Sequence, residues 1–122
     1  MELVTRAKDG WAKLRILTFQ RDGGCVAVNP TIFGGDVAPD QCRDRNGWLI
    51  PWNDLFKMEW DHVREEAGGA RVDDIAHGIT VCPWHHRGDG WRSDSKAHRM
   101  MERLYLRSLY PEQWLEGSDA TS

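Results

Sequence analysis

The sequence predicts a small α+β domain in which a helix precedes two short strands and a second helix follows them. A helical spacing of apolar residues runs from Trp11 to Asp22. Two short runs, 58–64 and 75–81, carry the apolar and β-branched residues typical of strands. A second helical spacing covers 96–110 and ends before Pro111. These three observations decide the fold class.

Length and composition indicate a single domain with a small apolar core that needs a further source of stability. The chain has 122 residues, which favours a single domain over 1–116, and the polar end at 117–122 predicts a disordered tail. With 29% charged residues and a mean hydropathy of −0.63, few aliphatic residues remain for a core. A chain this small and polar often relies on a structural metal.

The three cysteines and the absence of a targeting segment indicate a reducing compartment. An odd number of cysteines cannot pair completely in disulfides. We find no signal-peptide pattern and no transmembrane run in the sequence, and therefore expect no membrane partner. We therefore expect a cytoplasmic protein, in a bacterial or phage-infected cell, whose cysteines bind metal.

The first helix is expected to be amphipathic and to lead directly to the first cysteine. Trp11, Leu14, Leu17 (or Thr18) and Phe19 recur near helical spacing, and Gly23-Gly24 ends the helix. The glycines turn the chain so that the thiol of Cys25 points inward.

The second helix is expected to begin at a serine cap, either Ser93 or Ser95. Arg99, Arg103 and Arg107 recur every fourth residue and form one stripe. Apolar residues form another face, made of Ala97, Met100, Met101, Leu104 and Tyr105.

Three cysteines and one histidine form a candidate zinc site. Cys82 and His85 have the tight spacing of paired zinc ligands, and Cys25 and Cys42 are the other two thiols. Together they make a Cys3His set that is suited to a closed tetrahedral structural zinc. Binding at such a site contributes on the order of 10 kcal/mol to folding. The alternative is three buried free thiols and a surface histidine.

A second group of residues, Asp61, His62 and His86, suggests metal-assisted hydrolysis. Asp61 and His86 offer an oxygen and a nitrogen to a catalytic divalent ion such as Mg²⁺ or Mn²⁺. An imidazole such as that of His62 is suited to remove a proton from water as general base. Because neighbours on a strand face opposite ways, a distortion is needed to bring Asp61 and His62 to one site.

The order of these residues resembles that of the HNH endonucleases. Trp60-Asp61-His62-Val63 stands where that family has an Asp-His on its first strand, and Cys82-Pro83-Trp84-His85-His86 stands where it has its final histidine. The similarity covers roughly residues 23–87 and extends to the size and layout of small phage-encoded HNH proteins. It implies a ββα-metal core with a structural zinc, flanked by N- and C-terminal helices.

The resemblance also implies roles for individual residues. His62 would be the general base, Asp61 and His86 would hold the catalytic ion, and Cys25, Cys42, Cys82 and His85 would hold the zinc. His77 stands at the position of the family's asparagine, which orients the site through hydrogen bonds; His77 either takes over that role or joins the metal. A histidine also replaces the fourth zinc cysteine, and sixteen residues separate the first two cysteines.

The charge distribution is compatible with DNA binding next to this site. The net charge of −3 argues against a protein that coats nucleic acid. Residues 83–110, however, carry six basic side chains against three acids, and the basic ones are candidates for contacts with the DNA backbone. They are Arg87, Arg92, Lys96, Arg99, Arg103 and Arg107. A merely solvated helix face is the alternative.

Three functions follow from these observations. The first is an HNH-type DNA endonuclease or nickase that hydrolyses phosphodiester bonds. The second is a zinc-held module that binds nucleic acid or a protein without chemistry. The third lies between them: an adaptor in phage DNA packaging that nicks only beside a larger partner such as a terminase.

Overall fold

The computed structural model describes residues 7–34, 37–66, 68–88 and 91–114 of the chain. Four α-helices, four short 3-10 helices and two strands are found in these residues. The predicted tail at 117–122 lies outside the described residues. No helix in the described part has the length and apolar character needed to cross a bilayer.

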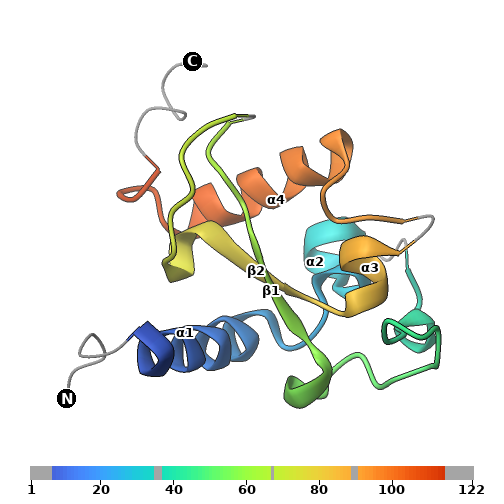
Figure 1. Cartoon of the computed structure of the whole chain (residues 1–122). Helices are drawn as coiled ribbons and strands as arrows, with labels where there is room; N and C mark the ends of the chain where they lie inside the picture. The colour runs from blue at the N-terminus through green and yellow to red at the C-terminus, as the bar shows by residue number, and fades with distance from the viewer. Residues whose placement is uncertain (1–6, 35–36, 67, 89–90, 115–122) are drawn as a thin grey trace.

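Two antiparallel strands lie at the centre of the fold. Strand β1 (Glu59–His62) pairs with β2 (Gly78–Val81), and Asp61 stands opposite Ile79. Both strands are shorter than predicted. In β2 the reason is that residues 75–77 form the 3-10 helix η4 (Ile75–His77) instead of extending the strand. Figure 1 shows the strand pair with α1 on one side and α4 on the other. The α+β class is confirmed.

Helix α1 (Ala7–Asp22) packs against the sheet through polar side chains. Trp60 Nε1 donates to Thr18 Oγ1 at 2.9 Å, and the Thr80 N–H donates to Asp22 Oδ2 at 2.9 Å. Of the predicted face, Thr18 is buried and Phe19 packs against the core, whereas Trp11 and Leu17 are exposed. The predicted face of the helix is therefore confirmed only in part.

Helix α4 (Lys96–Leu109) also buries a face that the apolar pattern did not predict. Ser95 caps it by accepting from the His98 N–H, as one of the two expected serines. Met100 and Leu104 are more than half exposed, whereas Glu102 and Leu106 are fully buried. The helix turns this way because Arg99 pairs with Asp61 of β1, and Glu102 pairs in turn with Arg99.

The remaining elements surround the end of the sheet that carries the cysteines. They are η1 (Val26–Val28), α2 (Pro30–Phe33), η2 (Pro39–Gln41), η3 (Leu55–Lys57) and α3 (Pro83–Arg87). Buried apolar side chains from η1, α2 and β2 join Leu106 and Trp114 in a core cluster. The three cysteines belong to this cluster, so the candidate zinc site lies inside the core.

Candidate functional site

Cys25, Cys42, Cys82 and His85 lie together as the spacing predicted. All four are buried, and their ligand atoms lie within 4.8 Å of one another. His85 Nδ1 is 3.1 Å from Cys82 Sγ, 3.7 Å from Cys25 Sγ and 3.8 Å from Cys42 Sγ. This arrangement is consistent with a structural metal such as zinc, bound through three sulfurs and Nδ1.

Gly24 brings Cys25 into the cluster by a close approach of two chain segments. A Cβ atom on Gly24, whose φ is +143°, would lie 2.6 Å from the carbonyl oxygen of Trp52. The next residue, Cys25, donates its backbone N–H to that same oxygen at 2.9 Å. The Gly23-Gly24 pair therefore turns the thiol inward as predicted, and only glycine fits at position 24.

The chemistry of the four donors fits a zinc ion. Hydrogen bonds from Cys25 and Cys42 lower the pKa of the Cys82 thiol far below its usual range, whereas burial raises that of Cys25. Backbone N–H groups also point at sulfur: Cys82 N–H at Cys25 Sγ (3.3 Å) and His85 N–H at Cys82 Sγ (3.4 Å). Such N–H···S contacts stabilise thiolates, which are the form that binds zinc.

Asp61 and His86 form a second group, next to the zinc cluster. His86 Nε2 is 3.3 Å from Asp61 Oδ1, and His86 Nδ1 is 2.6 Å from Glu59 Oε1. Glu59 and Asp61 share one face of β1 because side chains alternate along a strand. His86 comes from α3, one residue after the zinc-cluster histidine. The imidazole therefore lies between two carboxylates, one at each ring nitrogen.

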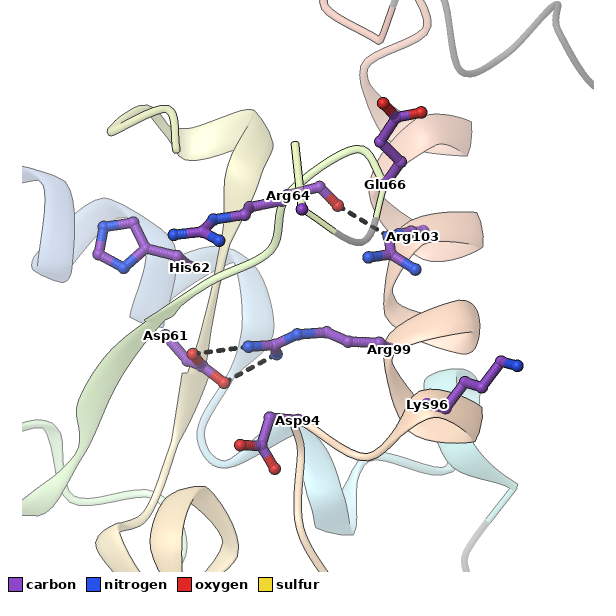
Figure 2. A pocket seen from close by; sticks show the side chains of 9 residues that line it. Asp61, His62, Arg64, Glu66, Asp94, Lys96, Arg99 and Arg103 are labelled. Atoms are coloured by element: carbon purple, nitrogen blue, oxygen red, sulfur yellow. Dashed lines mark hydrogen bonds and ion pairs between the residues drawn. The ribbon is translucent and has the colours of Figure 1, made fainter. Parts of the chain in front are cut away.

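Arg99 and Ser93 complete the surroundings of Asp61. Arg99 Nη1 donates to Asp61 Oδ2 at 2.8 Å and Nη2 donates to Oδ1 at 3.0 Å, while the Ser93 hydroxyl donates to Oδ2. Arg99 Nη1 also lies 2.8 Å from Glu102 Oε1. Figure 2 shows the two parallel contacts between Arg99 and Asp61. This is a bidentate ion pair in a largely buried setting.

The charges of this group perturb one another's pKa values. Burial alone raises the pKa of Asp61, but hydrogen bonds from His86 and Arg99 outweigh burial and hold it well below its usual value. Burial lowers the pKa of His86, but Asp61 and Glu59 outweigh it and raise that pKa. Burial raises the pKa of Glu102 to about 8 in spite of Arg99. Asp61 is therefore ionised at neutral pH.

The side chain of His62 lies on the opposite face of β1 from that of Asp61. Its ring packs edge-on against Trp60 at 4.7 Å between centroids, and its Nε2 is 2.7 Å from Asp73 Oδ1. In Figure 2 the ring points away from Asp61. Asp61, His62 and His86 do not form a three-ligand group, because within the described ranges only the Cys3His set does. The strand stays regular, without the distortion that convergence required.

His77 lies apart from Asp61 and His86. It is buried, its Nδ1 is 2.7 Å from Asp74 Oδ1 and its Nε2 is 3.0 Å from Glu65 Oε2. Its ring stacks on Trp114 at 4.8 Å between centroids. Because both nitrogens are engaged, His77 joins the two ends of the loop between the strands. This location does not support a place for His77 in the metal group.

A groove of about 640 Å³ opens beside Asp61 and His62 (Figure 2). Both residues line it, although they point to different parts of it. Four basic side chains also line it: Arg64, Lys96, Arg99 and Arg103. Asp94 and Glu66 are acidic groups in the same wall. The groove therefore combines a buried carboxylate with a mainly basic lining.

The predicted DNA contacts divide into two sets. Lys96, Arg99 and Arg103 line the groove, but Arg99 binds Asp61 and the Nε of Arg103 donates to the carbonyl oxygen of Arg64 at 2.7 Å. The remaining three, Arg87, Arg92 and Arg107, do not line it. Arg92 pairs with Asp94 at 2.9 Å, and Arg87 is exposed at the end of α3. Lys96 and Arg103 are thus the predicted residues best placed for a phosphate.

Comparison with family models, curated proteins and solved structures finds no match to this chain. The arrangement of the site therefore carries the functional argument.

The structure adds residues that the sequence analysis did not select. They are Glu59, Asp73, Ser93 and Glu102. Glu59 could have been found, because it stands two positions before Asp61 and must share its face of the strand. The other three come from a loop, a linker and a helix, and no spacing rule connects them to β1.

Proposed function

We propose that this protein is a metal-dependent DNA endonuclease or nickase of the HNH type. The observation that carries the proposal is the contact of His86 Nε2 with Asp61 Oδ1 while His86 Nδ1 is held by Glu59. A carboxylate on the far nitrogen of a histidine is the usual support of a metal-binding imidazole. Asp61 of this pair also lines a groove to which Arg64, Lys96, Arg99 and Arg103 contribute positive charge.

The donor atoms suit a divalent ion with open positions for water and phosphate. Asp61 and His86 would hold it through one oxygen and one nitrogen, and Glu59 would fix the ring of His86. An ion bound there supplies positive charge that stabilises the phosphate and the leaving oxygen. Mg²⁺ and Mn²⁺ accept such oxygen-rich coordination.

His62 is the proposed general base. Its Nε2 is held by Asp73, so Nδ1 is the nitrogen that would accept a proton from water. The water oxygen then bonds to phosphorus, and the bond from phosphorus to the leaving oxygen breaks. A positioned base contributes about 10²–10⁴-fold in rate. The shared groove supports this role, since a phosphodiester lying in it would contact both His62 and Asp61.

The remaining predicted groups have supporting roles. Cys25, Cys42, Cys82 and His85 would hold a zinc that stabilises the core and the start of α3, which carries His86. His77 would hold the loop that carries Asp73, in place of the family's asparagine. Lys96 and Arg103 would contact the DNA backbone. A larger phage DNA-processing protein stays a predicted partner.

One observation favours the second candidate, a zinc-held module that binds nucleic acid without chemistry. Arg99 occupies both oxygens of Asp61, and His62 points away from it. On this alternative the Asp61–Arg99 pair is purely structural. The module would keep its zinc and its DNA affinity but would not cut in any metal.

A plasmid cleavage assay decides between the two. Supercoiled DNA is incubated with the zinc-loaded chain in Mg²⁺, Mn²⁺, Co²⁺ or Ni²⁺, and the nicked and linear products are quantified. His62→Ala is expected to lower the rate at least about 100-fold, whereas His98→Ala, a control histidine outside the groove lining, leaves it nearly unchanged. Cutting by His62→Ala at the parent rate would contradict the assignment, and DNA binding without cutting would establish the module.

A further inference from the structure

Arg99 stands in direct competition with a cation for Asp61. The side chain of Asp61 is 7% exposed, and both of its oxygens accept an N–H from the Arg99 guanidinium. The oxygen that faces His86 Nε2, Oδ1, is also the one bound by Arg99 Nη2. A divalent ion shared by Asp61 and His86 must therefore displace at least this contact, and the two positive charges would repel at close range.

Glu102 offers Arg99 a second place to bind. It lies on α4 three residues after Arg99 and is fully buried. Its Oε1 already contacts Arg99 Nη1 at 2.8 Å, whereas its Oε2 has no hydrogen-bond partner in the described part of the chain. A buried oxygen without a partner is energetically unfavourable, so a guanidinium that moved from Asp61 to both oxygens of Glu102 would remove that cost.

We propose that Arg99 is a displaceable counter-ion of the metal site. Its guanidinium neutralises Asp61 when no divalent cation is bound. When Asp61 and His86 take up the ion, the guanidinium moves onto Glu102, whose carboxyl group releases its proton to solvent so that both of its oxygens accept from Arg99. The inference rests on the proposed role of Asp61 and His86 as metal ligands. It removes Arg99 from the predicted contacts with the DNA backbone and makes it a positioning residue that sets metal affinity.

Metal affinity, measured without DNA, tests this role. Mn²⁺ is titrated into the zinc-loaded chain, and free Mn²⁺ is followed by electron paramagnetic resonance. Arg99→Gln is expected to bind Mn²⁺ about tenfold more tightly than the parent, because the competing group is gone. Arg64→Gln is the matched control: it removes the same charge from the same groove, and among the described residues the side chain of Arg64 has no contact with Asp61. Its affinity is expected within about twofold of the parent.

Glu102→Gln tests whether Glu102 receives the guanidinium. In the parent background this change is expected to weaken Mn²⁺ binding about threefold, and in the Arg99→Gln background it is expected to have no effect. An equal loss in both backgrounds would show that Glu102 acts on the ion by its own charge, and would overturn its role as receiver. Zinc content and thermal unfolding confirm that each variant is folded, and Arg99→Lys provides a second, milder variant with an intermediate affinity.

The titration also separates failure of the inference from failure of the proposed function. If the parent binds Mn²⁺ in a way that His86→Ala abolishes, but Arg99→Gln binds no more tightly, the counter-ion role is overturned and the metal pair stands. If neither the parent nor Arg99→Gln shows Mn²⁺ binding that depends on His86, the metal pair itself is overturned, and the inference with it.

Discussion

The Nδ1 atom of His86 lies 2.6 Å from Oε1 of Glu59. This contact fixes the ring so that Nε2 points at Asp61, which is 3.3 Å away. Glu59 therefore acts on the proposed metal site through His86, without being a ligand itself.

Replacing Glu59 tests this orienting role. Glu59→Gln is expected to weaken Mn²⁺ binding and to slow plasmid cleavage about tenfold or more, because carboxylates behind metal-binding histidines have effects of this size. Glu66→Gln is the control, since Glu66 lines the groove beside Asp61 and has no contact with His86 among the described residues. Equal effects of the two substitutions would mean that only the general negative charge matters.

Loss of the zinc cluster is expected to unfold much of the core. His85→Ala removes the Nδ1 that lies 3.1–3.8 Å from the three sulfurs, so the purified variant should contain no zinc. The free energy of unfolding should fall by several kcal/mol, out of about 10 kcal/mol that a structural zinc contributes. His98→Ala serves as control and should keep one zinc per chain by elemental analysis. A zinc-free His85→Ala that melts with the parent would contradict the structural role.

Glu102 is expected to make the free energy of unfolding decrease as the pH rises. Its pKa is about 8 in the folded chain against 4.5 for the free group, so between these values the unfolded chain has released a proton that the folded chain keeps. Stability is therefore lost as the pH rises through this window. Glu102→Gln is expected to abolish this decrease in the free energy of unfolding.

The measurement compares the free energies of unfolding of Glu102→Gln and the parent by urea titration at about pH 6 and pH 8. The variant is expected to gain about 2 kcal/mol relative to the parent over this interval. Glu112→Gln, an exposed glutamate near the end of the described residues, controls for a general effect of charge. A difference that does not change with pH would mean that burial does not raise the pKa of Glu102.

Gly78 is required by the packing of Trp60. A Cβ atom on Gly78 would lie 1.9 Å from Cζ2 of the Trp60 ring, although the backbone there is extended and free of strain. Gly78→Ala is expected to lower the free energy of unfolding by about 3 kcal/mol. The loss should shrink in a Trp60→Leu background, because the overlapping ring is absent. A full penalty in both backgrounds would place its cause elsewhere.

The zinc cluster and its neighbour His86 could be predicted from the sequence because ligand spacing is local. Cys82 and His85 lie on one short turn, and a glycine pair directs Cys25 toward them. The order of the strands and of the closing helix also followed from apolar runs and from the serine cap at Ser95. These features depend on neighbours in the chain, which pattern rules describe well.

The contacts between distant elements could not be predicted in this way. Arg99 belongs to a regular arginine stripe that is typical of a solvated helix face, yet it pairs with Asp61, which lies 38 positions earlier. That pairing turns Met100 and Leu104 outward and buries Glu102. The buried ion pair thus decided which face of α4 is buried, against the apolar pattern of the helix. Sequence periodicity cannot predict such a pair, because it describes only the spacing of apolar residues.

The most direct measurement of the central claim is the position of a bound ion. Mn²⁺ is titrated into the zinc-loaded, isotope-labelled chain, and paramagnetic broadening of the histidine ring signals is followed by NMR. The account predicts that the ring of His86 broadens at the lowest Mn²⁺ concentration, ahead of His98 and His77, and that Asp61→Asn abolishes this preference. Broadening that spares His86, or that is unchanged by Asp61→Asn, would contradict a metal site at Asp61 and His86.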